Sequence, residues 1–170
     1  MDDRPTRDPI REAHRQWVAH GWADAADGMA LVTSVVRVQQ LLSGRIEAVL
    51  RPLDLTFARF EVLRLLSFTR ERALPMTRLG SLLQVHPASV TSAVDRLEAQ
   101  GFVRRRRRSE DRRVVHAELT GAGATTVDAA TADLNAVFTD LGSDLGDDTV
   151  RDLTRLLGAL RAGAGDRVDP

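Results

Sequence analysis

Five consecutive arginines, residues 104–108, lie between two apolar stretches and therefore belong to a folded segment rather than to a basic tail. The flanking patterns predict two strands, 102–107 and 114–119, joined by a polar hairpin loop over 108–113. Together with that loop, the run holds seven arginines and two acids, a local charge of +5. Like charges on one strand repel each other. DNA phosphates are natural groups to offset that repulsion, because each neutralised phosphate releases counterions.

Directly before the hairpin, two short helices separated by a tight turn form a helix-turn-helix pattern. Thr77 is expected to cap the first helix, Gln84-Val85 to form the turn, and Pro87 to open the second helix, which Gly101 ends. The second helix carries small polar side chains opposite its apolar face, which fits a major groove. By itself this helix is equally explained as a solvated face with a capping cluster. The hairpin favours DNA, because a hairpin that follows a recognition helix forms a wing that reaches the minor groove.

Amphipathic helices flank this middle segment. Apolar residues recur at three- and four-residue steps over about 29–50, and a helix capped by Thr56 follows. Two further helices begin after Thr120 and at Asp147, and a short helix is expected over residues 10–20. The long helix at 29–50 and the last two helices have no apolar partner in their own sequence neighbourhood. Their apolar faces therefore need a partner from elsewhere.

The charge of the chain is unevenly distributed, although its 170 residues sum to zero. Residues 1–51 are neutral, residues 52–127 carry +5 and residues 128–170 carry −5. This distribution is typical of a chain with one surface that faces a polyanion. The absence of cysteine excludes disulfides, iron–sulfur clusters and thiol sensing. No apolar run approaches the roughly 18 residues of a membrane span and no secretory signal is visible, so we expect a cytoplasmic protein.

The sequence gives little support for an enzyme, a metal site or a cofactor. The four histidines have no metal-ligand spacing and are better explained as packing or solvated side chains. Residues 121–126 begin like a dinucleotide fingerprint, but Thr126 stands where the third glycine belongs and no parallel strand precedes it. We expect no catalytic residue, no metal and no cofactor.

The middle of the chain resembles the multiple-antibiotic-resistance regulator (MarR) family, and the resemblance extends from about residue 29 to 161. It rests on Leu79-Gly80-x-x-Leu83, Pro87-Ala-Ser-Val-Thr91-x-x-Val94-x-x-Leu97-Glu98-x-x-Gly101-Phe102-Val103-x-Arg105, Asp111-Arg112-Arg113 and Leu119-Thr120-x-x-Gly123. The resemblance implies an obligate homodimer whose N- and C-terminal helices interlock and whose two winged helices read one palindromic site. It also implies that Arg113 enters the minor groove, that Asp111 orients the wing, and that the helix after Val85 reads bases.

The pattern and the resemblance together predict a mainly α fold with a small β-hairpin wing, in three parts. These parts are an N-terminal arm and dimerisation helix (1–51), a winged helix-turn-helix DNA-binding domain (52–120) and C-terminal dimerisation helices (121–170). The expected DNA contacts are Thr77, Arg78, His86, Ala88, Ser89, Thr91, Ser92, Arg96, Arg105, Arg107, Arg108, Asp111 and Arg113. Arginines 104–108, 78 and 96 are expected on phosphates, and Ser89 and Ser92 on bases.

In proteins similar to this one, a small aromatic or anionic effector binds between the dimerisation helices and the winged helix and lowers DNA affinity. The residues expected to line such a crevice are His14, Trp17, Trp22, Arg45, Phe57 and Phe60, with plain core or interface packing as the alternative for most of them. We expect a homodimeric, ligand-releasable repressor of double-stranded DNA whose half-sites lie about 10 bp apart. The alternative is a winged-helix protein-interaction module without sequence-specific DNA binding.

Overall fold

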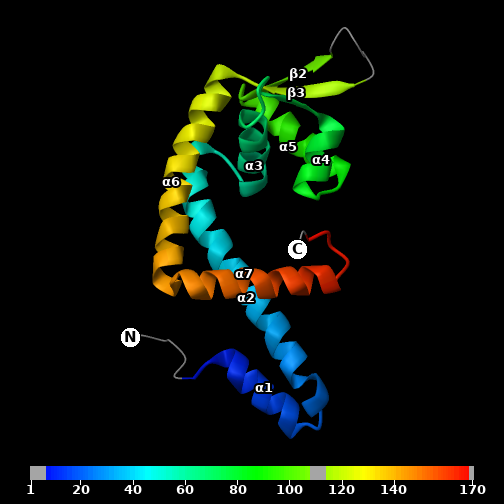
Figure 1. Ribbon diagram of the computed structural model, residues 1–170, viewed down its shortest axis with the longest axis vertical. Coiled ribbons are helices and arrows are strands. Elements are labelled where there is room, and N and C mark those ends of the chain that lie inside the picture. The colour runs from blue at the N-terminus through cyan, green and yellow to red at the C-terminus, as the bar shows by residue number, and fades with distance from the viewer. Residues whose placement is uncertain (1–6, 108–113, 169–170) are drawn as a thin grey trace. The chain divides into compact units, whose positions relative to one another are not determined.

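The computed structural model describes residues 7–107 and 114–168 and is mainly helical with one small antiparallel sheet (Figure 1). The expected mainly α fold with a β-hairpin is confirmed. The elements in chain order are α1 (Pro9–Ala19), α2 (Ala23–Leu50), a 3-10 turn η1 (Arg51–Leu53), α3 (Phe57–Ser67), β1 (Ala73–Pro75), α4 (Met76–Leu83), α5 (Pro87–Ala99), β2 (Val103–Arg107), β3 (Val115–Leu119), α6 (Gly121–Leu145) and α7 (Asp147–Gly163). By their contacts the residues form two units, one ending at Glu47 and one beginning at Ala48. Within the described residues, no helix has the length and apolar character that a membrane crossing requires.

The first unit is held together where α1 meets the start of α2. The His14 ring on α1 lies 2.8 Å from the Asp27 carboxylate on α2. The residue before Asp27, Ala26, is buried. Trp17 and Trp22 pack edge to face with ring centroids 5.4 Å apart. The aromatic and polar contacts therefore close a helical hairpin in the first unit.

The predicted boundaries of these first helices need one correction. The short helix expected over 10–20 is present as α1, but the long helix begins at Ala23 rather than near Met29. Gly21, at φ +85°, turns the chain between the two helices. The first six residues of α2 include Asp24, Asp27 and Gly28. This composition has too few apolar residues to show a helical period, so the pattern understated the length of the helix.

The second unit contains a three-stranded antiparallel sheet with strand order β1-β3-β2. The hairpin β2–β3 pairs Val103 with Leu119 at its base and Arg107 with Val115 at its far end. Strand β1 was not predicted, because three residues ending in Pro75 show no alternating pattern. The chain enters α4 directly from Pro75, so Pro75 rather than Thr77 occupies the N-cap position and the predicted Thr77 cap is wrong.

Helices α3, α4 and α5 pack on one another and against the sheet, and α6 packs along α3. Apolar positions at helical spacing supply the core because each helix buries one stripe. The core side chains of this unit include Val62, Leu63, Leu66, Leu79, Val90, Val94, Leu97, Val103, Ala117, Leu119, Val127 and Leu134, all at most 6% exposed. The apolar stripes of α3 and α5 therefore face the core, with the exposed Phe57 as the exception on α3.

The start of α6 is fastened to the base of the hairpin. Thr120 caps α6 through its hydroxyl, which accepts from the Gly123 N–H at 3.0 Å. The same hydroxyl lies 2.8 Å from the carbonyl oxygen of Gly101, and the Thr120 N–H donates to the Phe102 carbonyl at 3.0 Å. A Cβ added at Gly123 would lie only 2.1 Å from that Phe102 oxygen. This close approach requires glycine.

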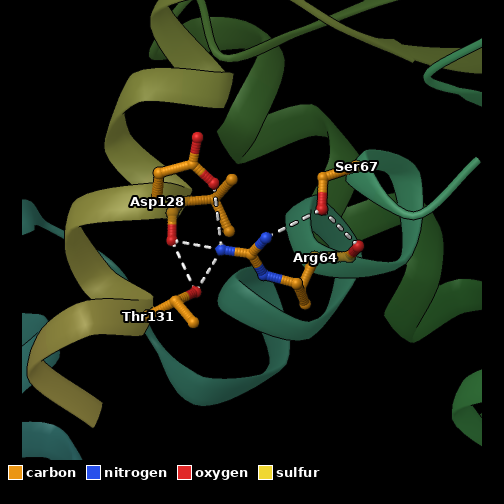
Figure 2. Close-up of polar contacts among 5 residues, drawn as sticks. Arg64, Ser67, Asp128 and Thr131 are labelled. Atoms are coloured by element: carbon orange, nitrogen blue, oxygen red, sulfur yellow. Dashed lines mark hydrogen bonds and ion pairs between the residues drawn. The ribbon is translucent and has the colours of Figure 1, made fainter. Parts of the chain in front are cut away.

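A second fastening joins the middle of α6 to α3 through Arg64 (Figure 2). The Arg64 guanidinium donates to the Val127 carbonyl at 2.8 Å, to Asp128 at 3.2 Å and to Thr131, all on α6. It also donates to Ser67 at 3.1 Å on α3 itself. The Arg64 side chain is only 18% exposed, so these bonds stabilise a charge that water reaches poorly, while its buried Nε has no hydrogen-bond partner among the described residues.

Among the described residues, two helices expose large apolar side chains. No residue of α7 is buried, and Leu153, Leu156, Leu157 and Leu160 are each 44–54% exposed. On α2 the exposed apolar residues are Leu31, Val32, Val36, Val38 and Leu41. The apolar faces of these helices were predicted to need a partner from elsewhere. In the described residues of one chain these faces stay exposed.

Candidate nucleic-acid interface

Helix α5 presents a polar face at its N-terminal half. His86 is the N-cap, and its Nδ1 accepts the Ala88 N–H at 3.2 Å. Ala88, Ser89, Thr91 and Ser92 are exposed, while the opposite face of the helix is buried in the core. Small side chains let a nucleic-acid backbone or base edge approach the helix closely, and the N–H groups of the first turn attract a phosphate.

An open groove of about 780 Å³ runs beside this face, between α5 and the start of α3. Ala88, Ser89, Ser92 and Arg96 line it from α5, and Arg59 lines it from α3. The groove thus combines hydroxyl groups and two guanidinium groups, which are the donors that bases and phosphates accept from.

The groove lining includes a cluster of polar contacts that the sequence did not indicate. Gln100 donates to both the backbone oxygen and the carboxylate of Asp54 at 2.8 Å. Arg59 in turn donates to the Gln100 amide oxygen at 3.1 Å and lies 3.8 Å from the Asp54 carboxylate. The end of α5 is therefore held to the turn that precedes α3.

The arginine run divides its charges between the two faces of strand β2, because successive side chains of a strand point to opposite faces. Arg104 and Arg106 pair with Glu118 on β3, at 2.5 and 3.4 Å. The hydrogen bond from Arg104 holds the pKa of the Glu118 carboxyl below its ordinary value, against the opposing effect of burial. The expected repulsion is therefore partly offset within the chain.

Arg105 faces the other way and ties the hairpin to α5. Its guanidinium lies 2.6 Å from Asp95 and 2.6 Å from Glu98, and its backbone N–H donates to Glu98 at 2.9 Å. A weaker bond of 3.5 Å reaches the Thr91 carbonyl. The side chain predicted as a DNA contact thus has an internal role, because it fixes the angle between the hairpin and the polar helix.

The other predicted contact residues are distributed around this assembly. Thr77 and Arg78 are exposed in the first turn of α4, and Arg107 is exposed at the far end of β2. Arg108, Asp111 and Arg113, including the predicted minor-groove arginine, lie outside the described residues. The described exposed cations from α4, α5 and β2 are therefore Arg78, Arg96 and Arg107, with Arg104 and Arg106 shared with Glu118.

The residues predicted to line an effector crevice lie in both units. His14, Trp17, Trp22 and Arg45 belong to the first unit, and the exposed Arg45 stands on α2. Phe57 and Phe60, on α3, line a pocket in the second unit together with residues of α4 and α6. In residues 7–107 and 114–168, no cluster of three or more His, Cys, Asp or Glu side chains has the arrangement of a metal site.

Sequence reasoning missed the acidic partners of the arginine run and the groove residues Thr56 and Arg59. The signal for the partners was present. Alternation along β2 sends Arg105 to the helix side, and Asp95 and Glu98 are three residues apart on one face of α5. No comparable pattern pointed to Arg59, because its place in the groove depends on how α3 packs against α5.

Comparison with known proteins agrees with this geometry. Residues 55–115 match the family model described as MarR family. The crystal structure of Sco5413, a MarR family transcriptional regulator from Streptomyces coelicolor, is 40% identical and superimposes with a TM-score of 0.72. That similarity covers 83% of this chain and 99% of Sco5413.

Two further relatives extend the comparison. A mutant MarR from E. coli complexed with operator DNA is 26% identical, with a TM-score of 0.71 over 80% of this chain and 96% of that chain. The HTH-type transcriptional repressor YetL of Bacillus subtilis is 30% identical over 98 residues, which span 58% of this chain and 59% of YetL. The matched part is thus less than two thirds of YetL. The winged-helix fold, the matching family model and the near-complete cover of Sco5413 show that this chain belongs to the MarR family of transcriptional regulators.

Proposed function

We propose that the protein is a homodimeric, sequence-specific DNA-binding repressor that a small molecule releases from its operator. The observation that carries the proposal is the joining of the polar face of α5 to the arginine-bearing strand β2 through Arg105, Asp95 and Glu98. A helix and a hairpin fixed to each other in this way suit two neighbouring grooves of one duplex.

The proposed division of labour follows the chemistry of the side chains. Ser89 and Ser92 stand on the exposed face of α5, where their hydroxyls serve base edges in the major groove. Arg78, Arg96 and Arg107 serve phosphates, which give affinity without sequence preference. Arg113 and Asp111, outside the described residues, are proposed to act at the wing tip as the family resemblance implies.

A homodimer is proposed because the exposed apolar residues of α2 and α7 need cover. Two copies related by symmetry would present two α5 helices to one face of a duplex, with half-sites about 10 bp apart. The E. coli MarR relative was crystallised with operator DNA, which supports a duplex as the partner. Repression is the proposed outcome because the relative YetL is named a repressor.

The test begins with selection of duplexes from a random pool, followed by anisotropy titrations against the selected and a random duplex over a salt series. The repressor proposal expects a specific affinity at least about a thousandfold above the random duplex. The same affinity for both would overturn it and would leave the protein-interaction module as the better hypothesis.

Variants separate the proposed roles. Arg96→Ala is expected to weaken binding to all duplexes and to lower the slope of log affinity against log salt by about one. Ser89→Ala is expected to change which base is preferred and to leave that slope unchanged. Arg11→Ala, an exposed arginine on α1, is the matched control and should change neither.

A further inference from the structure

A small apolar pocket lies between α3, α4 and α6 in the second unit, with a volume of about 280 Å³. Three phenylalanine rings line it, Phe57 and Phe60 from α3 and Phe138 from α6. The rings of Phe57 and Phe60 stack with centroids 6.1 Å apart, and Leu82 and Leu83 of α4 also line the pocket. This volume is just below the range of about 300–1,000 Å³ for ligand sites, which suits a molecule with one ring.

One acidic side chain, Glu61, lines this pocket. Its carboxylate makes no hydrogen bond or ion pair with any described residue. Glu61 is half-buried, and burial raises the pKa of its carboxyl above the ordinary value, so its charged form is less well solvated than in open water. A cation bound beside it would supply the opposite charge that the described residues do not give it.

Arg64 lines the same pocket but does not neutralise Glu61. Its guanidinium is directed to α6, where it donates to the Val127 carbonyl and to Asp128 (Figure 2). The centre of its guanidinium also lies 5.5 Å from the centroid of the Phe68 ring. The positive charge of Arg64 is therefore engaged elsewhere, and the negative charge of Glu61 is left to the pocket.

We propose that this pocket binds a small organic cation, an ammonium group on an aromatic or apolar body, with the ammonium against Glu61 and the body against the phenylalanine rings. Aromatic faces attract cations and the carboxylate supplies the opposite charge, so the two recognition elements act on one ligand. The inference rests on the proposed function, since such a ligand would be the effector. It replaces the aromatic or anionic effector expected from the family resemblance by a cationic one.

The test is calorimetric titration of the full chain, without DNA and near neutral pH, with three probes of similar shape. These are 2-phenylethylammonium, 2-phenylethanol and phenylacetate, which carry charges of +1, 0 and −1. The ammonium is expected to bind about tenfold more tightly than the alcohol, as one charge-assisted hydrogen bond allows. Phenylacetate is expected to bind most weakly of the three.

Two variants and one control assign the preference to Glu61. Glu61→Gln should lower the affinity for the ammonium to the affinity for the alcohol. Leu82→Trp should block the pocket and weaken the ammonium and the alcohol alike, and it serves if the first variant fails to fold. Glu47→Gln, an exposed residue of α2 outside the pocket lining, should leave the order of the probes unchanged.

Three results would overturn the proposal: tighter binding of phenylacetate, the same order of probes in Glu61→Gln, or no binding of the ammonium. Operator affinity is measured separately and without any probe. Loss of the DNA activity would therefore be seen independently of loss of the ligand preference.

Discussion

Substitution of Gly123 by alanine tests the fastening between α6 and the hairpin. The added Cβ would lie 2.1 Å from the Phe102 oxygen and 2.9 Å from a Leu119 methyl carbon, whereas ordinary contact begins at 3.4 Å. The backbone must therefore move by more than 1 Å at a buried position. Such a shift costs about 1–3 kcal/mol in overpacking. It also weakens the bonds around Thr120, which contribute about 1 kcal/mol each.

The opposing effect is the helix preference of alanine, which favours the variant by about 1 kcal/mol. The cost exceeds this gain, so we expect Gly123→Ala to lose about 2 kcal/mol of unfolding free energy. A protein of this size then loses about 4–8 °C in Tm at 2–4 °C per kcal/mol.

Thermal and urea unfolding at one fixed protein concentration measure this loss, because the stability of an oligomer depends on concentration. Gly121→Ala is the matched control: Gly121 is in the same turn of α6, and a Cβ added there meets no atom within 4 Å. The control keeps the helix preference of alanine without the clash, so it should be as stable as the wild type or more stable by up to about 1 kcal/mol. Equal or greater stability of Gly123→Ala than of the wild type would refute the close approach to Phe102.

The remaining predictions concern charged side chains. Arg105→Gln is expected to cost about 1–2 kcal/mol of stability, from two partly exposed ion pairs and a hydrogen bond to charge, and to leave the salt slope of DNA binding unchanged. Arg107→Gln should do the reverse, because it should lower the salt slope by about one with little effect on stability. Urea unfolding measures the stability of the two variants, and anisotropy titration measures their salt slopes. A lowered slope in Arg105→Gln would make Arg105 a phosphate contact. Burial raises the pKa of Glu61 above 4.5, so the folded state loses stability as pH rises from 4.5 through the raised pKa. Glu61→Gln should therefore be more stable than the wild type at neutral pH but not in acid. Arg104 lowers the pKa of Glu118 below 4.5, so its contribution is present above that pH and is lost as pH falls through the depressed pKa. Glu118→Gln should accordingly be less stable than the wild type at neutral pH, and Tm measured against pH should show the two differences with opposite signs.

Most helices could be predicted because their buried stripes repeat at helical spacing and their ends carry clear signals. Thr56 and Thr120 both cap the helices predicted for them. The hairpin was predictable because the apolar stretches 102–103 and 114–119 flank a polar loop of hairpin length. These are local signals, and local signals can be read from sequence.

The features that could not be predicted depend on contacts between segments that are distant in sequence. Strand β1 exists because Ala73–Pro75 pairs with β3, some forty residues later, and nothing inside three residues shows it. The roles within the arginine run could not be divided until Asp95, Glu98 and Glu118 were placed beside it. Glu61 shows no special sequence pattern, and only the packing of α3, α4 and α6 gives it an apolar surrounding.

The bonds of Arg64 make α3 and the facing turns of α6 one mechanical part. Their donors reach a backbone carbonyl as well as side chains, so α6 cannot slide or roll along α3 without breaking them. A tilt of this part of α6 would therefore carry α3 with it as long as these bonds and the apolar packing of the two helices hold. Replacement of the guanidinium would remove the polar part of that link and would leave the apolar packing in place.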